Sequence, residues 1–265
     1  RDLRIIDHAP LVEAAECGAV CPLYIFEPDI WSQPDASRRH YEFLLESLTE
    51  LDAALSALGQ GLIIRVGDAV EVLDTLKAET GFTRLWSHQE TGNGWSYARD
   101  LAVKKWARAN EVSWKERKQH GVMRGTHSRD KWAVNWHREM YQPRLSPPVQ
   151  LKPLSLPSRN LPAATELGLG PDDCPGRQKG GRREAMSLLD GFLTERGQTY
   201  RRDMSSPLTG EWTCSRLSPH FSFGTLSIRE ALQASEARRR APMEKGWAGS
   251  LKAFESRLRW HCHFI

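Results

Sequence analysis

The feature that most constrains the fold is an alternation of short apolar runs with amphipathic segments in the first half of the chain. The apolar runs have the length of buried strands and occupy residues 20–26, 62–66, 84–87 and 112–114. The segments between them repeat apolar residues at helical spacing and occupy residues 38–58, 70–76 and 97–110. Strands that alternate with helices form a mostly parallel, doubly wound sheet. We therefore predict a Rossmann-like α/β fold for this half.

The second half begins with a proline-rich stretch and continues as helices. Eight prolines lie between residues 143 and 175, which disfavours regular structure and indicates a linker. Helical patterns then occupy residues 183–196, 218–223, 227–237 and 249–265. We predict an α/β domain at 1–135, a linker at 136–180 and an all-α domain at 181–265. The last helix has no stop signal and no apolar strand precedes residue 1, so we expect both ends to belong to a longer protein.

Composition excludes some classes of protein. The net charge is +4, and no apolar run is long enough to span a membrane. Five cysteines without paired metal-site spacing predict reduced thiols in a cytoplasmic protein and no metal site. Basic clusters such as 104–144 and 238–240 fit either a solvated helix surface or a phosphate-binding face. No P-loop, nucleophile elbow or zincin motif is present.

Hydroxyl groups gather at the predicted start of a helix. The segment from Thr213 to Ser218 carries three hydroxyls, a thiol and a guanidinium in six residues. Free backbone N–H groups at a helix start favour anions, so this segment could bind phosphate. The alternative is ordinary capping, in which Ser215 or Ser218 caps a helix that begins at Pro219.

Three segments together resemble the DNA photolyase and cryptochrome family. They are the opening Arg1-Asp2-Leu3-Arg4, the segment 213–227 and the segment 254–264. The resemblance implies an α/β antenna domain followed by the first part of a helical FAD-binding domain. It also implies FAD as cofactor, held in part by a tyrosine and a Gly-Thr-Ser-Arg-Leu-Ser segment. The matching residues here are Tyr200, Thr213, Cys214, Ser215, Arg216, Leu217 and Ser218. Cys214 replaces the family's threonine and is a weaker hydrogen-bonding group.

The same resemblance implies a face that binds DNA and its lesion. The residues concerned are Arg202, Phe254, Arg257, Trp260 and His261. In repairing members a glutamate binds the dimer at the position of Arg257, and an arginine stands at the position of His261. The charge reversal at Arg257 disfavours that mode of lesion binding. For Trp260 alone, core packing is an equal alternative.

Residues 88–95 follow a predicted strand, where open α/β sheets form ligand sites. In the family this region leads to an Arg-Asp pair, here Arg99-Asp100, and lines the site of an antenna chromophore of folate or deazaflavin type. The spacing does not select between the two, or between either and an empty site.

The resemblance implies light-driven, FAD-dependent repair of pyrimidine dimers in DNA by a monomeric, blue-light-absorbing flavoprotein, a carbon–carbon lyase. Two alternatives stay open: a cryptochrome-type photoreceptor without repair activity, and a non-flavin nucleotide-binding α/β protein. In the family, the residues that face the reactive part of the flavin lie beyond Ile265. We therefore expect no catalytic residue within this chain and no repair by these 265 residues alone.

Overall fold

The computed structural model describes residues 2–125 and 130–265, so Arg1 of the opening motif lies outside the described residues. The chain forms two compact units whose segments alternate along the sequence. The α/β unit comprises residues 8–117 and 145–181, and the helical unit comprises residues 2–7, 118–144 and 182–265. Each unit is described by itself below, and the domain boundaries expected from the sequence stay a prediction.

The strands of the α/β unit pair in parallel, as the alternation predicts. β1 (Leu23–Phe26) pairs with β2 (Ile63–Val66), and Leu23 lies opposite Ile63. β3 (Arg84–His88) pairs with β4 (Ser113–Arg117). These strands form two two-stranded ladders in the described residues. Each strand overlaps a predicted apolar run, although β4 extends beyond its run to Arg117, and the prediction of a parallel α/β fold is confirmed.

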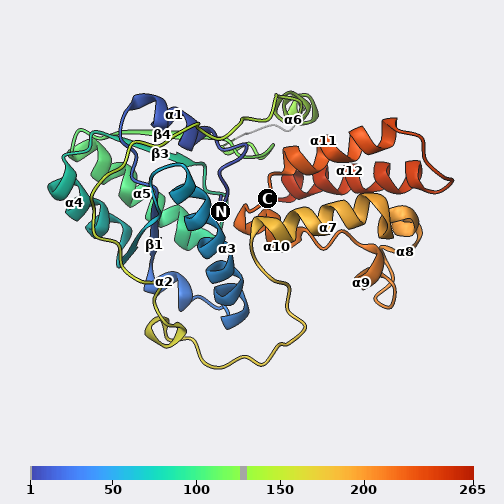
Figure 1. Cartoon of the computed structure of the whole chain (residues 1–265), viewed down its shortest axis with the longest axis horizontal. Coiled ribbons are helices and arrows are strands. Elements are labelled where there is room, and N and C mark those ends of the chain that lie inside the picture. The colour runs from blue at the N-terminus through green and yellow to red at the C-terminus, as the bar shows by residue number, and fades with distance from the viewer. Residues whose placement is uncertain (1, 126–129) are drawn as a thin grey trace. The chain divides into compact units, whose positions relative to one another are not determined.

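Helices pack around these strands within the α/β unit (Figure 1). Their bounds are α1 (Ala9–Cys17), α2 (Pro28–Trp31), α3 (Arg38–Ala57), α4 (Ala69–Thr80) and α5 (Gly94–Ala109). Local signals fix the ends of α4: the Asp68 carboxylate accepts the N–H groups of Val70 and Glu71, and Gly81 ends the helix with a left-handed φ of 65°. The sequence pattern predicts α3, α4 and α5, but not α1 or α2.

The proline-rich stretch packs on the α/β unit without strands of its own. In its described residues, one isolated β-bridge joins Lys152 to Ala19. The stretch also contains the short 3-10 helix η1 (Ala164–Leu167). Its end is fastened to α3, because Arg177 makes two hydrogen bonds to the Glu46 carboxylate at 2.6 and 3.0 Å. A Cβ at Gly180 would come within 2.0 Å of the Phe43 carbonyl oxygen, so only glycine fits that approach.

The helical unit is built from long helices and short turns. Its elements are α6 (Trp132–Met140), α7 (Arg182–Thr194), η2 (Arg196–Thr199), α8 (Tyr200–Asp203), α9 (Gly210–Thr213), α10 (Ser218–Phe223), α11 (Ile228–Arg240) and α12 (Trp247–Phe264). Figure 1 shows α7, α11 and α12 side by side, and their apolar faces form one core. Leu189, Leu232 and Leu251 are buried in that core, which is the helical pattern expected from residue 181 onward.

The N-terminal segment belongs to the helical unit. The buried Arg4 guanidinium donates to the Gly224 carbonyl oxygen at 2.9 Å and to the Asp7 carbonyl oxygen at 3.0 Å. The Asp7 carboxylate accepts from the Ser227 hydroxyl at 2.6 Å and pairs with Arg229 at 2.5 Å. Burial alone would raise the pKa of Asp7, but Ser227, Arg229 and Arg4 lower it overall.

Candidate functional site

The segment predicted to bind FAD connects α9 to α10. Thr213 ends α9, Cys214 is extended, and Arg216 has a left-handed φ of 61°. A non-glycine residue in that region is uncommon and reverses the chain locally. The buried Leu217 then precedes α10, whose first residue is Ser218. The N-cap residue of α10 is Leu217, which has no side-chain oxygen. The capping of α10 by Ser215 or Ser218 is therefore not observed.

Arg196 holds this segment in place. Its guanidinium donates to the carbonyl oxygens of Cys214 and Ser215, the latter at 3.1 Å. The same guanidinium donates to the Leu188 carbonyl oxygen on α7 at 2.7 Å. Burial lowers the pKa of Arg196, and the charge of Arg216 lowers it further. Two guanidinium groups therefore lie beside the backbone of the 213–218 segment.

Tyr200 lies next to this segment inside an aromatic cluster. Its ring meets Phe192 edge to face at 5.4 Å between centroids and Phe254 at 6.3 Å. Burial raises the pKa of the Tyr200 hydroxyl, and the nearby Cys214 adds to that rise. The Arg257 guanidinium opposes the rise through its charge and a hydrogen bond. Burial also raises the pKa of the Cys214 thiol, which keeps the thiol protonated at neutral pH.

The same neighbourhood contains part of the face predicted to bind a lesion. The Arg257 guanidinium lies 3.9 Å from the centre of the Trp260 ring and contacts the Met204 sulfur at 4.0 Å. Trp260 is 46% exposed, so it does not pack in the core. Phe254, in contrast, is 3% exposed and supports Tyr200 from within the core. The structure thus gathers Tyr200, Cys214 and Arg257, which the sequence separates by up to 57 residues.

Two further predicted residues lie at the margins of this group. The Arg202 side chain is exposed and pairs with the adjacent Asp203 carboxylate at 2.7 and 3.1 Å. That hydrogen bonding lowers the pKa of Asp203. The His261 ring packs edge to face against His120 and Phe221, with centroids 6.1 and 6.0 Å apart.

The loop predicted to face an antenna chromophore lies at the carboxyl end of β3. Asn93 caps α5 there by accepting the Ser96 N–H at 3.1 Å. Arg99 joins three carboxylates: it pairs with Glu27 at 2.6 Å, Asp100 at 2.8 Å and Glu90 at 3.6 Å. Burial raises the pKa of Glu27 despite the charge of Arg99. The predicted Arg-Asp pair is therefore part of an ion cluster that ties β1, β3 and α5 together.

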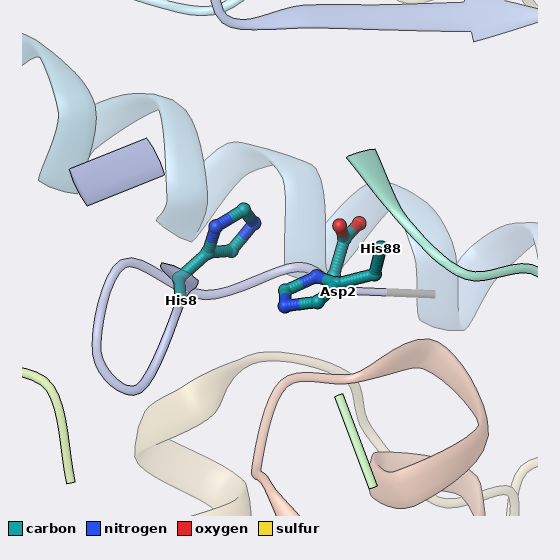
Figure 2. Close-up of side chains that lie close together, drawn as sticks. All are labelled: Asp2, His8 and His88. Carbon is teal, nitrogen blue, oxygen red and sulfur yellow. The ribbon is translucent and has the colours of Figure 1, made fainter. Parts of the chain in front are cut away.

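Two histidines of the α/β unit lie close together. Figure 2 shows the side chains of His8 and His88, whose ring centroids are 4.6 Å apart and whose planes are tilted by 60°. The Nδ1 atom of His8 accepts the Leu11 N–H at 3.0 Å and thereby caps α1. The prediction of no metal site stays a prediction.

Sequence reasoning missed Arg196 and the buried pair formed by His220 and Thr225. The Nδ1 atom of His220, on α10, and the Thr225 hydroxyl oxygen are 2.9 Å apart, and both residues are buried. Burial lowers the pKa of His220 to about 4. Arg196 acts through contacts with two other segments of the chain, and the His220–Thr225 contact lies within the 213–227 segment, where no periodicity or motif marks it.

Comparison with known proteins gives consistent matches. The family model described as DNA photolyase matches residues 1–131. A deoxyribodipyrimidine photo-lyase of Halobacterium salinarum is 27% identical over 98% of this chain and 58% of its own length. A cryptochrome DASH of Gloeobacter violaceus is 26% identical over 90% of this chain and 53% of its own length. The chain therefore spans little more than half of these relatives.

A solved structure shows the same fold. The crystal structure of a cryptochrome from Synechocystis superposes with a TM-score of 0.82 over 99% of this chain and 58% of that chain, at 18% identity. No described helix is long and apolar enough to cross a membrane. The relatives align over nearly all 265 residues. The parallel strands and the helical unit agree with the same family assignment. The chain belongs to the DNA photolyase/cryptochrome family.

Proposed function

We propose that the protein carries out light-driven, FAD-dependent repair of pyrimidine dimers in DNA. One observation carries this proposal: residues implied to contact the flavin and residues implied to contact the lesion meet in the helical unit. Tyr200 from the first set lies beside Arg257 from the second, and Cys214 lies near Tyr200 as well. The relatives include both photolyases and cryptochromes, so family membership supports a flavin photochemical protein and argues against a non-flavin nucleotide-binding protein.

The donor groups of the 213–218 segment suit the phosphates and hydroxyls of FAD. Thr213, Ser215 and Ser218 supply hydroxyls, Arg216 supplies a guanidinium, and backbone N–H groups at turns bind anions well. We infer that these groups, with Cys214, Leu217 and Tyr200, hold the cofactor. FAD supplies the light-absorbing group and the electron that splits the dimer. The chain's own contribution is to hold the segment rigid through Arg196 and to keep the Tyr200 and Cys214 side chains protonated.

On the DNA side, the exposed Trp260 ring offers a surface for an extruded base. Arg257 lies over the ring and Phe264 meets it edge to face at 6.1 Å between centroids, and the ring is still 46% exposed to a ligand. His261 and the exposed Arg202 add groups that can meet phosphates. Phe254 acts through Tyr200, because its ring is buried against it. A folate or deazaflavin antenna near residues 88–95 remains part of the proposal.

A specific observation favours the second candidate, a cryptochrome-type photoreceptor without repair. Arg257 occupies the position at which repairing relatives are expected to place a glutamate, and its guanidinium is committed to Trp260 and Tyr200. A glutamate accepts hydrogen bonds from a thymine edge, whereas a guanidinium only donates them. Loss of repair with retention of flavin photochemistry is the expected consequence of that exchange.

The deciding experiment is an absorption spectrum of the purified full-length protein, recorded after incubation with FAD and again after blue light with a reductant. We expect flavin bands that bleach. Arg216→Met should weaken FAD binding at least tenfold, and Arg84→Met on the exposed surface of the α/β unit should not change it. A wild-type protein that takes up no flavin would refute the proposal.

A dimer-repair assay on the same sample then separates the two candidates. Repair by the wild-type protein supports the photolyase assignment. Absence of repair in a photoactive wild type, with repair gained by Arg257→Glu, supports the photoreceptor assignment and identifies the residue responsible.

A further inference from the structure

The exposed face of α5 carries a stripe of aromatic, aliphatic and basic side chains. Its members, called the α5 stripe below, are Tyr97, Leu101, Lys104, Lys105 and Arg108. At 100° per residue, these five positions fall within about 100° of the helix circumference and extend over about 16 Å. The opposite face, which includes Val103 and Trp106, is buried in the core of the α/β unit. The stripe is therefore the solvent side of an amphipathic helix.

The three cations of the stripe are uncompensated. Within residues 2–125 and 130–265, neither Lys104, Lys105 nor Arg108 makes an ion pair. Together with Leu101 and Ala109 they line a shallow, open pocket on the helix surface. Arg99, one turn away on the same helix, instead pairs with Glu27 and Asp100. Three neighbouring unpaired cations create a local positive potential that attracts phosphate-bearing partners.

The apolar members narrow the class of partner. Tyr97 is 64% exposed and Leu101 is 50% exposed, although both are large apolar side chains next to a well-packed core. An acidic peptide would use the three cations and would leave the Tyr97 ring without a role. An unpaired nucleic-acid strand uses both, because its phosphates meet cations while its bases stack on exposed aromatic rings.

We propose that the α5 stripe binds an unpaired nucleic-acid strand, with Lys104, Lys105 and Arg108 on the phosphates and Tyr97 stacked on a base. This surface belongs to the α/β unit and shares no residue with the groups assigned to FAD or to the lesion. It acts on undamaged strands in the dark, and so it goes beyond the proposed function.

The test measures binding of a fluorescently labelled, undamaged oligodeoxythymidine by anisotropy at several salt concentrations. Each phosphate neutralised on a single strand contributes about 0.7 to the slope of log affinity against log salt. The triple variant Lys104→Gln, Lys105→Gln, Arg108→Gln should therefore lower that slope by about 2. A matched triple variant of exposed cations elsewhere on the α/β unit, Arg84→Gln, Lys152→Gln, Lys179→Gln, removes the same charge and should leave the slope unchanged.

Tyr97 provides the second arm. Stacking of one base on an aromatic ring is worth enough that Tyr97→Ala should weaken binding at least about fivefold, with Tyr97→Phe close to wild type. Equal slopes for the two triple variants would overturn the proposal. Loss of binding in the α5 triple variant, with no effect of Tyr97→Ala and equal competition by polyglutamate, would also overturn it in favour of an acidic protein partner. Failure of FAD uptake or dimer repair would leave these outcomes unaffected, because neither light nor damage is involved.

Discussion

Arg196 is the side chain on which the geometry of the 213–218 segment depends. One guanidinium satisfies the carbonyl oxygens of Leu188, Cys214 and Ser215, and so joins α7 to a segment whose next residue, Arg216, is in the left-handed region. A planar group with five donors can reach three acceptors at once, whereas an ammonium is a compact point charge. Arg196 is therefore a positioning residue for the segment that we assign to FAD.

Replacing Arg196 by methionine should remove this support. We expect a loss of about 1–3 kcal/mol in the free energy of unfolding, because partly buried carbonyl oxygens lose their donor. We also expect FAD to bind at least tenfold more weakly, with partial recovery in Arg196→Lys. Urea denaturation and a flavin fluorescence titration measure the two effects. Arg201→Met, on the exposed side of the neighbouring α8, is the control, and a similar loss of FAD affinity there would contradict the specific role of Arg196.

His220 should make stability depend on pH. Burial lowers its pKa from about 6.5 to about 4, so the unfolded chain binds the proton more readily than the folded one. Stability is then fully present above the unfolded pKa and falls as the pH drops from about 6.5 towards 4. Between pH 7 and pH 5 the loss from this residue should be about 2 kcal/mol. Urea denaturation at both pH values should show that His220→Gln loses less stability than wild type over this interval. An identical pH dependence of the two proteins would contradict the assignment.

At the scale of elements, α11 begins with a capping box that also holds the N-terminal segment. The Ser227 hydroxyl accepts the Glu230 N–H at 3.0 Å, and the Glu230 carboxylate accepts the Ser227 N–H at 3.0 Å. The same hydroxyl donates to Asp7 at 2.6 Å, and Glu230 pairs with Arg182 at 2.6 Å. One serine thus caps the start of a helix and secures a segment that is 220 residues away in the sequence.

Ser227→Ala should cost about 2–4 kcal/mol in the free energy of unfolding, because the cap is lost and the buried Asp7 carboxylate loses a donor. Ser227→Thr keeps a hydroxyl and should lose less. Thermal or urea unfolding measures both, with Ser205→Ala on an exposed turn as a control expected within about 0.5 kcal/mol of wild type. A cost for Ser227→Ala no larger than for this control would show that the cap does not stabilise the helix.

Elements with a long periodic pattern could be predicted from the sequence, and short ones could not. Leu44, Leu48 and Leu55 repeat at helical spacing and lie on the buried face of α3. The short α8 and α9 have too few residues for any period, and their backbone depends on the Arg196 and Asp203 contacts. Hydrophobic periodicity indicates which face of an element is buried. It cannot predict segments whose position depends on polar contacts.

The candidate site shows the same division. The resemblance pointed to Tyr200, the 213–218 segment and Arg257. The structure places both Cys214 and Arg257 close to Tyr200, although their functional roles stay predictions. Arg196 could not be found in this way, because its partners are carbonyl oxygens, which every residue has. Burial of Phe254 and exposure of Trp260 also needed the structure, since both sit on one helix whose pattern suits either arrangement.

At the scale of the whole molecule, the two units share the chain in alternating segments. Residues 2–7 belong to the helical unit, although residues 8–117 of the α/β unit follow them directly. Arg4 is the clearest case, because its buried guanidinium donates to Gly224 while burial lowers its pKa. A substitution near the start of the chain should therefore act on helices near its end.

Arg4→Met tests this arrangement. We expect faster hydrogen–deuterium exchange in α10 and α11, because the Gly224 carbonyl loses its donor and Asp7 is less well held. Exchange in β1 to β4 should change little. Glu13→Gln, which weakens the Arg117 pair at 2.5 and 2.7 Å within the α/β unit, should give the reverse pattern. Faster exchange confined to the strands of the Arg4→Met protein would contradict the division into units.

The pairing of Arg4 with Gly224 also bears on how the protein is made. A ribosome adds about 5–20 residues per second, so Arg4 leaves the exit tunnel about 10–45 s before the carbonyl that it will bind. During that interval the α/β unit can gather its strands, but a charged guanidinium destined for the interior stays in water. The helical unit can therefore complete its polar contacts only after synthesis has passed residue 224. A nascent chain stalled before that point should bind chaperones readily.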